Sequence, residues 1–382
     1  MTRQYYEFFG DLSVEVVGNG GRTSDQYSQM YDEFGVRSPD HEPDVVIEET
    51  TRDVDPDVVL GNPDDHYGWT GDHFVVRNND DYMAVEPGWS HIEVTPGFEP
   101  FYSIYPLEFE LRRRMVERDT ALMHASGVRF DGQTTLFPAW RSAGKTNTLL
   151  SLLREEADFL SDDRLWVGAD GSVTGYPLGM TFHPHNVESF PEIEIEHEHD
   201  TLRDRVRHEL HEFIDERFDR SGPLPEKGIA YMNETYLGGD NRRDFVKASS
   251  LYPTANFVEE STVDHFVFLE AAPNARTVGA EPIPVEEAMA AITAISNFEW
   301  DGRLREYFHA YDSLVGAGEM VGTLDEVIRQ ERVVFRDLFE NVATYRARIP
   351  RESHWTDRGL SEDVVDMVAS LETREKAKTS GV

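Results

Sequence analysis

Residues 139–146 read Ala139-Trp140-Arg141-Ser142-Ala143-Gly144-Lys145-Thr146 and stand between two apolar segments. Residues 134–138 are typical of a buried strand, and residues 146–153 carry the paired leucines of a buried helix. A loop between a strand and a helix can bind phosphate, because backbone N–H groups converge there and the helix N-terminus is electropositive. In this loop Lys145 supplies a cation for the β- and γ-phosphates, and the Thr146 hydroxyl is of the type that ligates Mg²⁺.

The 139–146 loop departs from the G-x-x-x-x-G-K-[ST] pattern at its first position, where Ala139 replaces glycine. A Cβ atom restricts the backbone conformations open to that residue. The pattern therefore leaves an alternative open, in which Gly144, Lys145 and Thr146 form a turn that only begins a helix.

An acidic pair follows the loop along the chain. Asp162 and Asp163 come directly after a short apolar strand, and Asp162 lies 17 positions after Lys145. Phosphoryl transfer needs a carboxylate for Mg²⁺, and transfer to a hydroxyl is helped by a second carboxylate that accepts its proton. The two aspartates can supply one role each, although a solvated turn is the alternative in a chain this acidic.

Four segments together carry a resemblance to a known family. They are Met123-His124-Ala125-Ser126-Gly127-Val128, Leu136-Phe137-Pro138, Ala143-Gly144-Lys145-Thr146 and Phe159-Leu160-Ser161-Asp162-Asp163. Their order and spacing resemble the HPr kinase/phosphorylase family, and the phosphoenolpyruvate carboxykinases share the same nucleotide-binding core. The chain looks most like the HPr-kinase-related serine kinases, over roughly residues 105–180 and more loosely over 265–349.

This resemblance implies ATP and Mg²⁺ as cofactors and a nucleotide held by the whole 139–146 loop, Ser142 included. It implies that Thr146 and Asp162 bind the metal, that Asp163 is the catalytic base, and that His124 lies near the transferred phosphate. The alternative for His124 is a half-buried strand histidine. The implied activity is Mg·ATP-dependent phosphoryl transfer to a hydroxyl of a protein serine or a small molecule.

Two other functions stay open. A non-catalytic ATP-binding regulatory or assembly module is favoured by Ala139, and a structural protein with a vestigial loop would bind no nucleotide. The family's glycine-rich signature after the acidic pair is not convincingly present, and residues that would hold an organic acid are not identifiable. Carboxykinase activity is therefore not expected.

The fold class expected is α/β, with an HPr-kinase/phosphoenolpyruvate-carboxykinase-type P-loop core. We expect an N-terminal β-rich domain over residues 1–104, a kinase-like nucleotide-binding domain over 105–350, and a C-terminal helix and disordered tail over 351–382. An acidic, histidine-containing stretch over 191–222 predicts a helical insertion.

Local signals predict further elements within these parts. A single strand over 122–130 is expected to turn at Asp131-Gly132. Helices are expected from Pro106 to Met115, from Pro284 onward, and from a capping box at Thr323 and Glu326. Core strands are expected over 159–160, 266–269 and 343–349.

Histidine pairs and an arginine pair are further candidate sites. His183-Pro184-His185 and His197-Glu198-His199 could bind Zn²⁺ or Mn²⁺, with solvated histidines as the alternative. His183 could instead face the phosphates. Arg242-Arg243 could contact the acceptor or the nucleotide.

The charge balance of the chain limits the classes of partner that it can bind. The chain has 36 Lys and Arg against 73 Asp and Glu, a formal net charge of −37, spread along its length. Such an excess is typical of halophilic proteins and argues against nucleic acid as a partner.

There is no cysteine, and no apolar run approaches the roughly 20 residues that span a bilayer. We expect a soluble, cytoplasmic protein with no membrane span, and leave the oligomeric state open, a homo-oligomer included.

The charge excess generates the first prediction. Raising KCl from low to molar concentration should raise the melting temperature, because salt screens the repulsion between surface carboxylates. Thermal unfolding followed by circular dichroism in a KCl series measures this. A melting temperature that does not rise with KCl would count against a halophilic origin.

Overall fold

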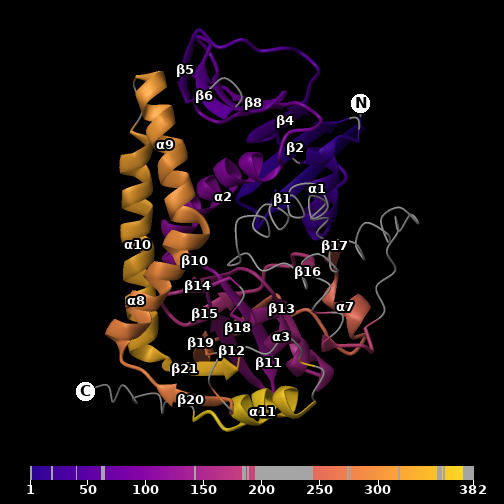
Figure 1. Cartoon of the computed structure of the whole chain (residues 1–382), viewed down its shortest axis with the longest axis vertical. Coiled ribbons are helices and arrows are strands. Elements are labelled where there is room, and N and C mark those ends of the chain that lie inside the picture. Colours follow the sequence, from indigo (N-terminus) through magenta and orange to yellow (C-terminus); the bar gives the residue numbers. More distant parts are fainter. Residues whose placement is uncertain are drawn as a thin grey trace, which may run out of the picture.

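The structure, a computed structural model, shows a mixed α/β protein built on several sheets (Figure 1). The residues it describes are 2–18, 20–39, 41–61, 65–141, 143–182, 186, 189–193, 244–272, 275, 277–316, 319–350, 355 and 358–372. No helix within these ranges is long and apolar enough to cross a membrane.

The N-terminal part forms a nine-stranded sheet in the order β3-β1-β2-β4-β9-β8-β7-β6-β5. Its strands are β1 (Thr2–Phe8), β2 (Leu12–Gly18), β3 (Gly35–Val36), β4 (Val45–Glu49), β5 (Val58–Gly61), β6 (Asp65–Trp69), β7 (Phe74–Asn78), β8 (Asp81–Val85) and β9 (His91–Val94). The expectation of β-structure in this region is confirmed. The helix α1 (Arg22–Met30) and the 3₁₀ turn η1 (Asp32–Phe34) were not predicted.

A six-stranded sheet in the order β13-β11-β12-β19-β21-β20 carries the expected motifs. Its strands are β11 (Ala125–Phe130), β12 (Gln133–Pro138), β13 (Asp158–Ser161), β19 (His265–Ala272), β20 (Gly279–Pro282) and β21 (Ala343–Pro350). Side chains alternate between its faces: Val267 and Leu269 join one core, whereas Phe266 and Phe268 join another.

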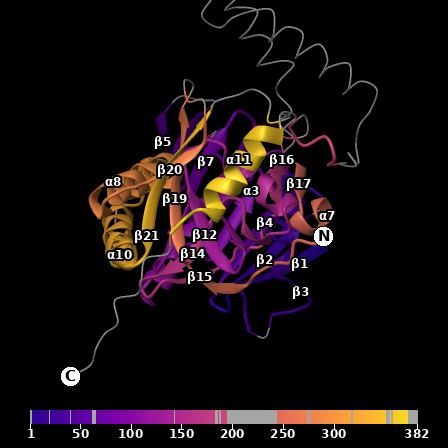
Figure 2. The same cartoon turned by 90° about the horizontal axis from the view of Figure 1, so that it is seen from below.

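Helices cover both faces of this sheet. The first core packs against α3 (Lys145–Arg154) and α11 (Arg358–Ala369), and the second packs against α8 (Val285–Ser296) and α10 (Met320–Asn341). Figure 2 shows α11 and α3 together, with α8 and α10 on another side of the strands. Both sheet faces are therefore buried.

Two smaller sheets complete the β-structure of the described residues. One has the order β10-β14-β15-β18, formed by β10 (Thr120–Met123), β14 (Leu165–Gly168), β15 (Ser172–Thr174) and β18 (Glu260–Thr262). The other pairs β16 (Met180–Phe182) with β17 (Asp244–Val246), which leads into the short helix α7 (Ala248–Leu251).

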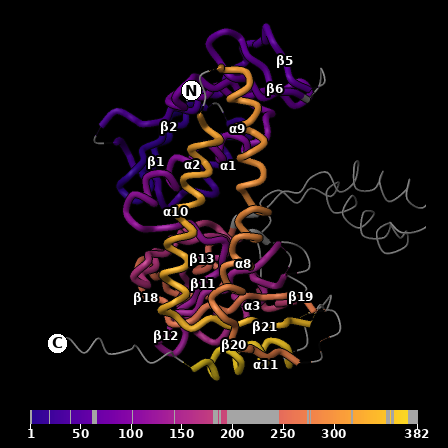
Figure 3. The backbone as a smooth tube through the Cα atoms, turned by 90° about the vertical axis from the view of Figure 1, so that its left-hand side faces the viewer, coloured from indigo at the N-terminus to yellow at the C-terminus, as the bar shows by residue number. Residues whose placement is uncertain are grey.

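Long helices join the two halves of the molecule. The helix α2 (Phe101–Val116) leads from the nine-stranded sheet toward β10, and α9 (Gly302–Val315) and α10 run along the same side (Figure 3). Between α8 and α9 lies the π-helical turn η3 (Asn297–Asp301). Within this bundle Arg112 of α2 is buried and ion-paired with Asp301 at 2.9 Å and with Glu331 at 2.5 Å.

Several local predictions are confirmed. The turn at Asp131-Gly132 joins β11 to β12 with φ values of 50° and 77°, the conformation that favours these two residues. The strands at 159–160, 266–269 and 343–349 are found as β13, β19 and β21, and α8 begins after Pro284.

One local prediction is wrong, and two predicted helices are found but begin at other residues. The single strand over 122–130 is two strands, β10 and β11, in different sheets with His124 between them; the apolar pattern continues through the break because both strands are buried. The helix expected from Pro106 begins at Phe101, so Pro106 lies inside α2. The helix expected at Thr323 begins at Met320.

The capping box fails for an identifiable reason. The Thr323 hydroxyl donates to the Glu319 carbonyl, while the N–H groups of Met320 and Val321 donate to the Asp312 carboxylate. A cap supplied by the preceding helix leaves no signal at the helix start itself.

Some predictions fall outside the described residues. They concern the insertion from residue 194 onward, both His-x-His pairs, Arg242-Arg243 and the tail from residue 373. The domain boundaries at 104 and 350 stay predictions.

Candidate functional site

The direction of the strands brings the motifs to one edge of the six-stranded sheet. The strand β11 is antiparallel to both β12 and β13, so β12 and β13 run in the same direction. The 139–146 loop follows β12, and Asp162 and Asp163 follow β13. His124 directly precedes β11, whose first residue pairs with the last residue of β12 (Ala125↔Pro138). All three motifs therefore meet at the same edge.

The 139–146 loop leads directly into α3. Gly144 has φ 97°, a left-handed conformation that favours glycine, and its carbonyl accepts the hydrogen bond of the Thr148 N–H at 2.9 Å. The N–H groups of the preceding turn, from Lys145 to Asn147, have no partner within the helix. Ser142 lies outside the described residues. The helix N-terminus thus has the form that binds anions in other proteins.

Ala139 can occupy the first position of the loop although it is not a glycine. It is fully buried and forms a parallel bridge with Leu269, so it continues the direction of β12. Ala139 is not among the described non-glycine residues with positive φ. The replacement of glycine is therefore compatible with the chain path, because the Cβ atom packs in the core.

Lys145 and His124 lie in direct contact. Lys145 Nζ is 2.6 Å from His124 Nε2 and donates more weakly to the Ala139 carbonyl at 3.5 Å. The other ring nitrogen, His124 Nδ1, is 3.4 Å from Asp163 Oδ1. The buried His124 ring therefore lies between the loop lysine and the acidic pair.

The two aspartates lie in different surroundings. Asp162 is buried, and its Oδ2 accepts a hydrogen bond from the Thr146 hydroxyl at 3.3 Å. Its Oδ1 is buried and has no hydrogen-bond partner among the described residues. The Asp163 side chain is 42% exposed and pairs with Arg164 at 2.7 Å. Arg164 in turn pairs with Glu108.

The turn η3 adds residues that the motifs did not predict. Glu299 lies with Oε2 3.2 Å from Arg141 Nη2 and with Oε1 3.6 Å from His124 Nε2. The ring of Trp300 meets that of His124 edge-on at 5.6 Å. The only sequence signal was Phe298-Glu299-Trp300, an acid between two aromatics directly after an apolar helix.

Two exposed aromatic side chains, one from the loop and one from η3, contact each other. Trp140 and Phe298 are 45% and 47% exposed, and their rings lie 4.7 Å apart. The Arg141 guanidinium lies 6.0 Å from the Phe298 ring. The loop and η3 therefore approach one another through side chains that remain accessible to solvent.

Burial shifts the pKa values of the three groups in the interior of the site. Desolvation, followed by the nearby Lys145 charge, lowers the pKa of His124 well below its usual range. Desolvation also lowers the pKa of Lys145, against the opposing effect of the carboxylates. Desolvation and the Asp163 charge raise the pKa of Asp162 to about 7. Shifts of this kind concentrate at functional sites.

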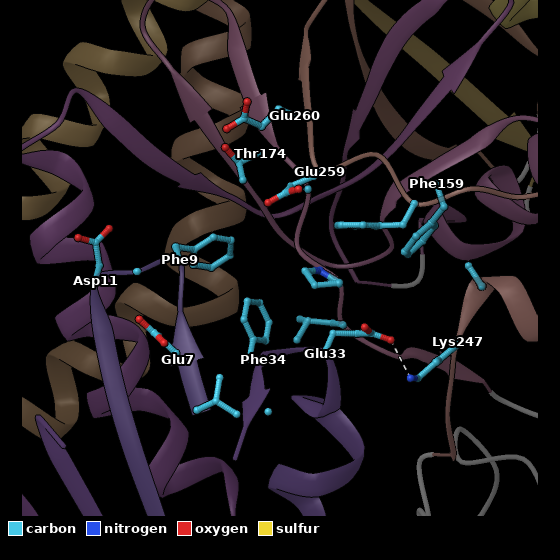
Figure 4. A pocket seen from close by; sticks show the side chains of 18 of the residues that line it. Glu7, Phe9, Asp11, Glu33, Phe34, Phe159, Thr174, Lys247, Glu259 and Glu260 are labelled. Carbon is cyan, nitrogen blue, oxygen red and sulfur yellow. Dashed lines mark hydrogen bonds and ion pairs between the residues drawn. The ribbon is translucent and has the colours of Figure 1, made fainter. Parts of the chain in front are cut away.

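A cavity of about 720 Å³ lies elsewhere, between the N-terminal sheet and residues of the 174–178 and 247–260 segments, with Phe159 of β13 (Figure 4). Figure 4 shows Phe9, Phe34 and Phe159 in this cavity, with Lys247 paired to Glu33. Its described lining includes no residue of the 139–146 loop or of the acidic pair. Carboxylates outnumber cations there, which disfavours a phosphate ligand.

Comparison with known proteins adds no relative. No protein-family model matches the chain, and no curated protein is significantly similar to it. The resemblance of the motifs to HPr kinases therefore remains a hypothesis that depends on the residues and their arrangement.

The pKa of Asp162 generates a prediction about stability. Asp162→Asn should stabilise the protein relative to the wild type, and more at pH 8 than at pH 5. The folded-state pKa is about 7, above the unfolded value of about 3.9. The protonated carboxyl therefore contributes stability that is fully present below pH ~4 and is lost as the pH rises through about 7.

Denaturant unfolding at pH 5 and pH 8 in molar KCl measures this difference, which should widen by on the order of 1–3 kcal/mol. Asp158→Asn is the matched control at the other end of β13, because hydrogen bonds from Asn256 and Arg129 hold the pKa of Asp158 below its usual range. An Asp162→Asn effect that is equal at both pH values contradicts the prediction.

Proposed function

We propose that the protein is an Mg·ATP-dependent phosphotransferase that acts on a hydroxyl of a protein or small molecule, with a nucleotide core like that of the HPr kinases. The contact between Thr146 and Asp162, at 3.3 Å, carries this proposal. A loop hydroxyl and a strand-end carboxylate are the pair that holds Mg²⁺ in P-loop phosphotransferases. Here they come from segments 16 positions apart and meet at the N-terminus of α3.

The residues fit the substrate as follows. The N–H groups at the start of α3 and the Lys145 ammonium bind the β- and γ-phosphates. Thr146 and Asp162 hold Mg²⁺, which neutralises charge on the phosphate oxygens when it is bound. The buried Asp162 Oδ1, which lacks a hydrogen-bond partner among the described residues, suits a metal ligand.

The exposure of the two carboxylates supports a division of roles. Asp162 is buried beside Thr146, whereas Asp163 is partly exposed and open to an acceptor from outside. Asp162 contacts Thr146 whereas Asp163 faces His124, so the two carboxylates serve different partners. We assign the base to Asp163, which is oriented by Arg164 and faces His124.

The proposed reaction is a direct displacement. The acceptor oxygen forms a bond to the γ-phosphorus, the bond from that phosphorus to the β,γ-bridging oxygen breaks, and ADP leaves with the electron pair. The hydroxyl proton passes to the Asp163 carboxylate.

The activity is assigned to the cytoplasm on the same proposal, because a cysteine-free, acidic chain suits that compartment.

Lys145→Ala tests the phosphate site. The variant should fold normally but bind Mg·ATP at least about a hundredfold more weakly. The reason is that a buried ammonium group hydrogen-bonded to the phosphates contributes about 3 kcal/mol to the free energy of binding. Calorimetric titration in molar KCl measures the affinity. Lys247→Ala removes a lysine that pairs with Asp32 and Glu33 outside the site and is the control. Unchanged ATP affinity in Lys145→Ala would end this proposal.

Two further variants test the roles of the carboxylates. Asp162→Asn should weaken Mg²⁺-dependent ATP binding as well as phosphoryl transfer, because it removes a metal ligand. Asp163→Asn should bind Mg·ATP like the wild type but lose about 10²–10⁴-fold in rate, the usual worth of a general base. Mg·ATP affinity and ADP formation are compared across a panel of hydroxyl acceptors. Wild-type protein that binds ATP but transfers to no acceptor would favour the non-catalytic module.

A further inference from the structure

Glu299 is a buried carboxylate that the proposed chemistry does not use. Its side chain is 7% exposed although the preceding residue, Phe298, is 47% exposed. One oxygen accepts a hydrogen bond from Arg141 at 3.2 Å. The other, Oε1, is buried without a hydrogen-bond partner among the described residues, and it lies 3.6 Å from His124 Nε2.

The groups around this carboxylate are those that bind an anion. Arg141 belongs to the 139–146 loop, and its planar guanidinium suits phosphate oxygens. His124 Nε2 is also 2.6 Å from Lys145 Nζ, the cation assigned to the β- and γ-phosphates. The carboxylate of Glu299 therefore contacts Arg141 and His124, and His124 in turn contacts Lys145.

A structural role for Glu299 does not account for this arrangement. The turn η3 is anchored by its last residue, Asp301, in the buried ion pair with Arg112. The ion-pair partner of Glu299, Arg141, is 54% exposed, and exposed pairs stabilise a fold by only about 0–1 kcal/mol. A buried oxygen that accepts no hydrogen bond destabilises a fold by more free energy than such an exposed pair contributes to its stability. The position of Glu299 is thus explained by the site rather than by the fold.

We propose that the Glu299 carboxylate occupies the subsite of the terminal phosphoryl group, and that this group displaces it from Arg141 when the nucleotide binds. This inference rests on the proposed function and adds a ligand subsite to it. The phosphoryl oxygens then take Arg141 as a second cation beside Lys145. Glu299 acts as an internal competitor for the anion, and it lowers the affinity for ligands that carry the terminal phosphate.

The subsite predicts a difference between two nucleotides. Mg·ATP reaches Arg141 and Glu299 through its γ-phosphate, whereas Mg·ADP ends before them. Glu299→Gln keeps the shape of the side chain but removes its negative charge. This variant should bind Mg·ATP about three- to tenfold more tightly than the wild type, whereas its affinity for Mg·ADP should change by less than about twofold.

The experiment is a double-mutant cycle by calorimetric titration of Mg·ATP and Mg·ADP in molar KCl. It compares the wild type, Glu299→Gln, Arg141→Gln and the double variant. Arg141→Gln should weaken Mg·ATP binding. In a protein that already carries Arg141→Gln, adding Glu299→Gln should raise the Mg·ATP affinity by a smaller factor than it does in the wild type. Glu287→Gln is the matched control, because Glu287 of the neighbouring helix α8 pairs with Arg346 at 2.8 Å outside the site.

The outcomes separate the two proposals. Tighter Mg·ATP binding in Glu299→Gln with little change for Mg·ADP, and coupling to Arg141, supports the subsite. Equal changes for both nucleotides, weaker Mg·ATP binding, or additive effects of the two substitutions would overturn it while leaving the phosphotransferase proposal intact. Failure of both the wild type and Glu299→Gln to bind either nucleotide removes the proposed function and the subsite together.

Discussion

The buried ion pair of Arg112 is the interaction on which the arrangement of the molecule depends. This guanidinium joins α2, which leaves the nine-stranded sheet, to Glu331 of α10 and to Asp301 at the end of η3. A buried charge is tolerated only when its partners are held in place, so the three elements cannot shift independently. Because Asp301 is fixed, Glu299 and Trp300 two and one positions earlier are directed toward His124. A contact between the two halves thus determines what faces the 139–146 loop.

The parts of the site that could be predicted are those encoded by neighbouring residues. A strand, a Gly-Lys-Thr turn and a leucine-rich helix form one local unit, and the helix N-terminus follows from that unit alone. The acidic pair after β13 was also recognisable, since a short apolar strand precedes it. The hairpin of β11 and β12 then sets the direction of the strands and brings these units together.

The parts that could not be predicted depend on residues far apart in the chain. The end of β10 at Met123 is decided by its pairing with β14, more than 40 positions away, and no local signal marks it. The cap of α10 comes from Asp312 of the preceding helix. Glu299 reaches the loop because a π-helical turn changes the direction of side chains between α8 and α9, and nothing in the apolar periodicity of α8 predicts such a turn.

A chain with a net charge of −37 must still attract polyphosphate if the proposed function is right. In molar salt the Debye length is only about 3 Å, so the general repulsion from the acidic surface is screened. Contacts between the buried groups of the site, such as Lys145 and His124, are screened less than contacts on the surface. Binding on this proposal is then decided by which partners Arg141 and Lys145 already hold. Arg141 contacts a carboxylate and Lys145 contacts a histidine, so affinity reflects exchange of internal partners for phosphate rather than attraction from a distance.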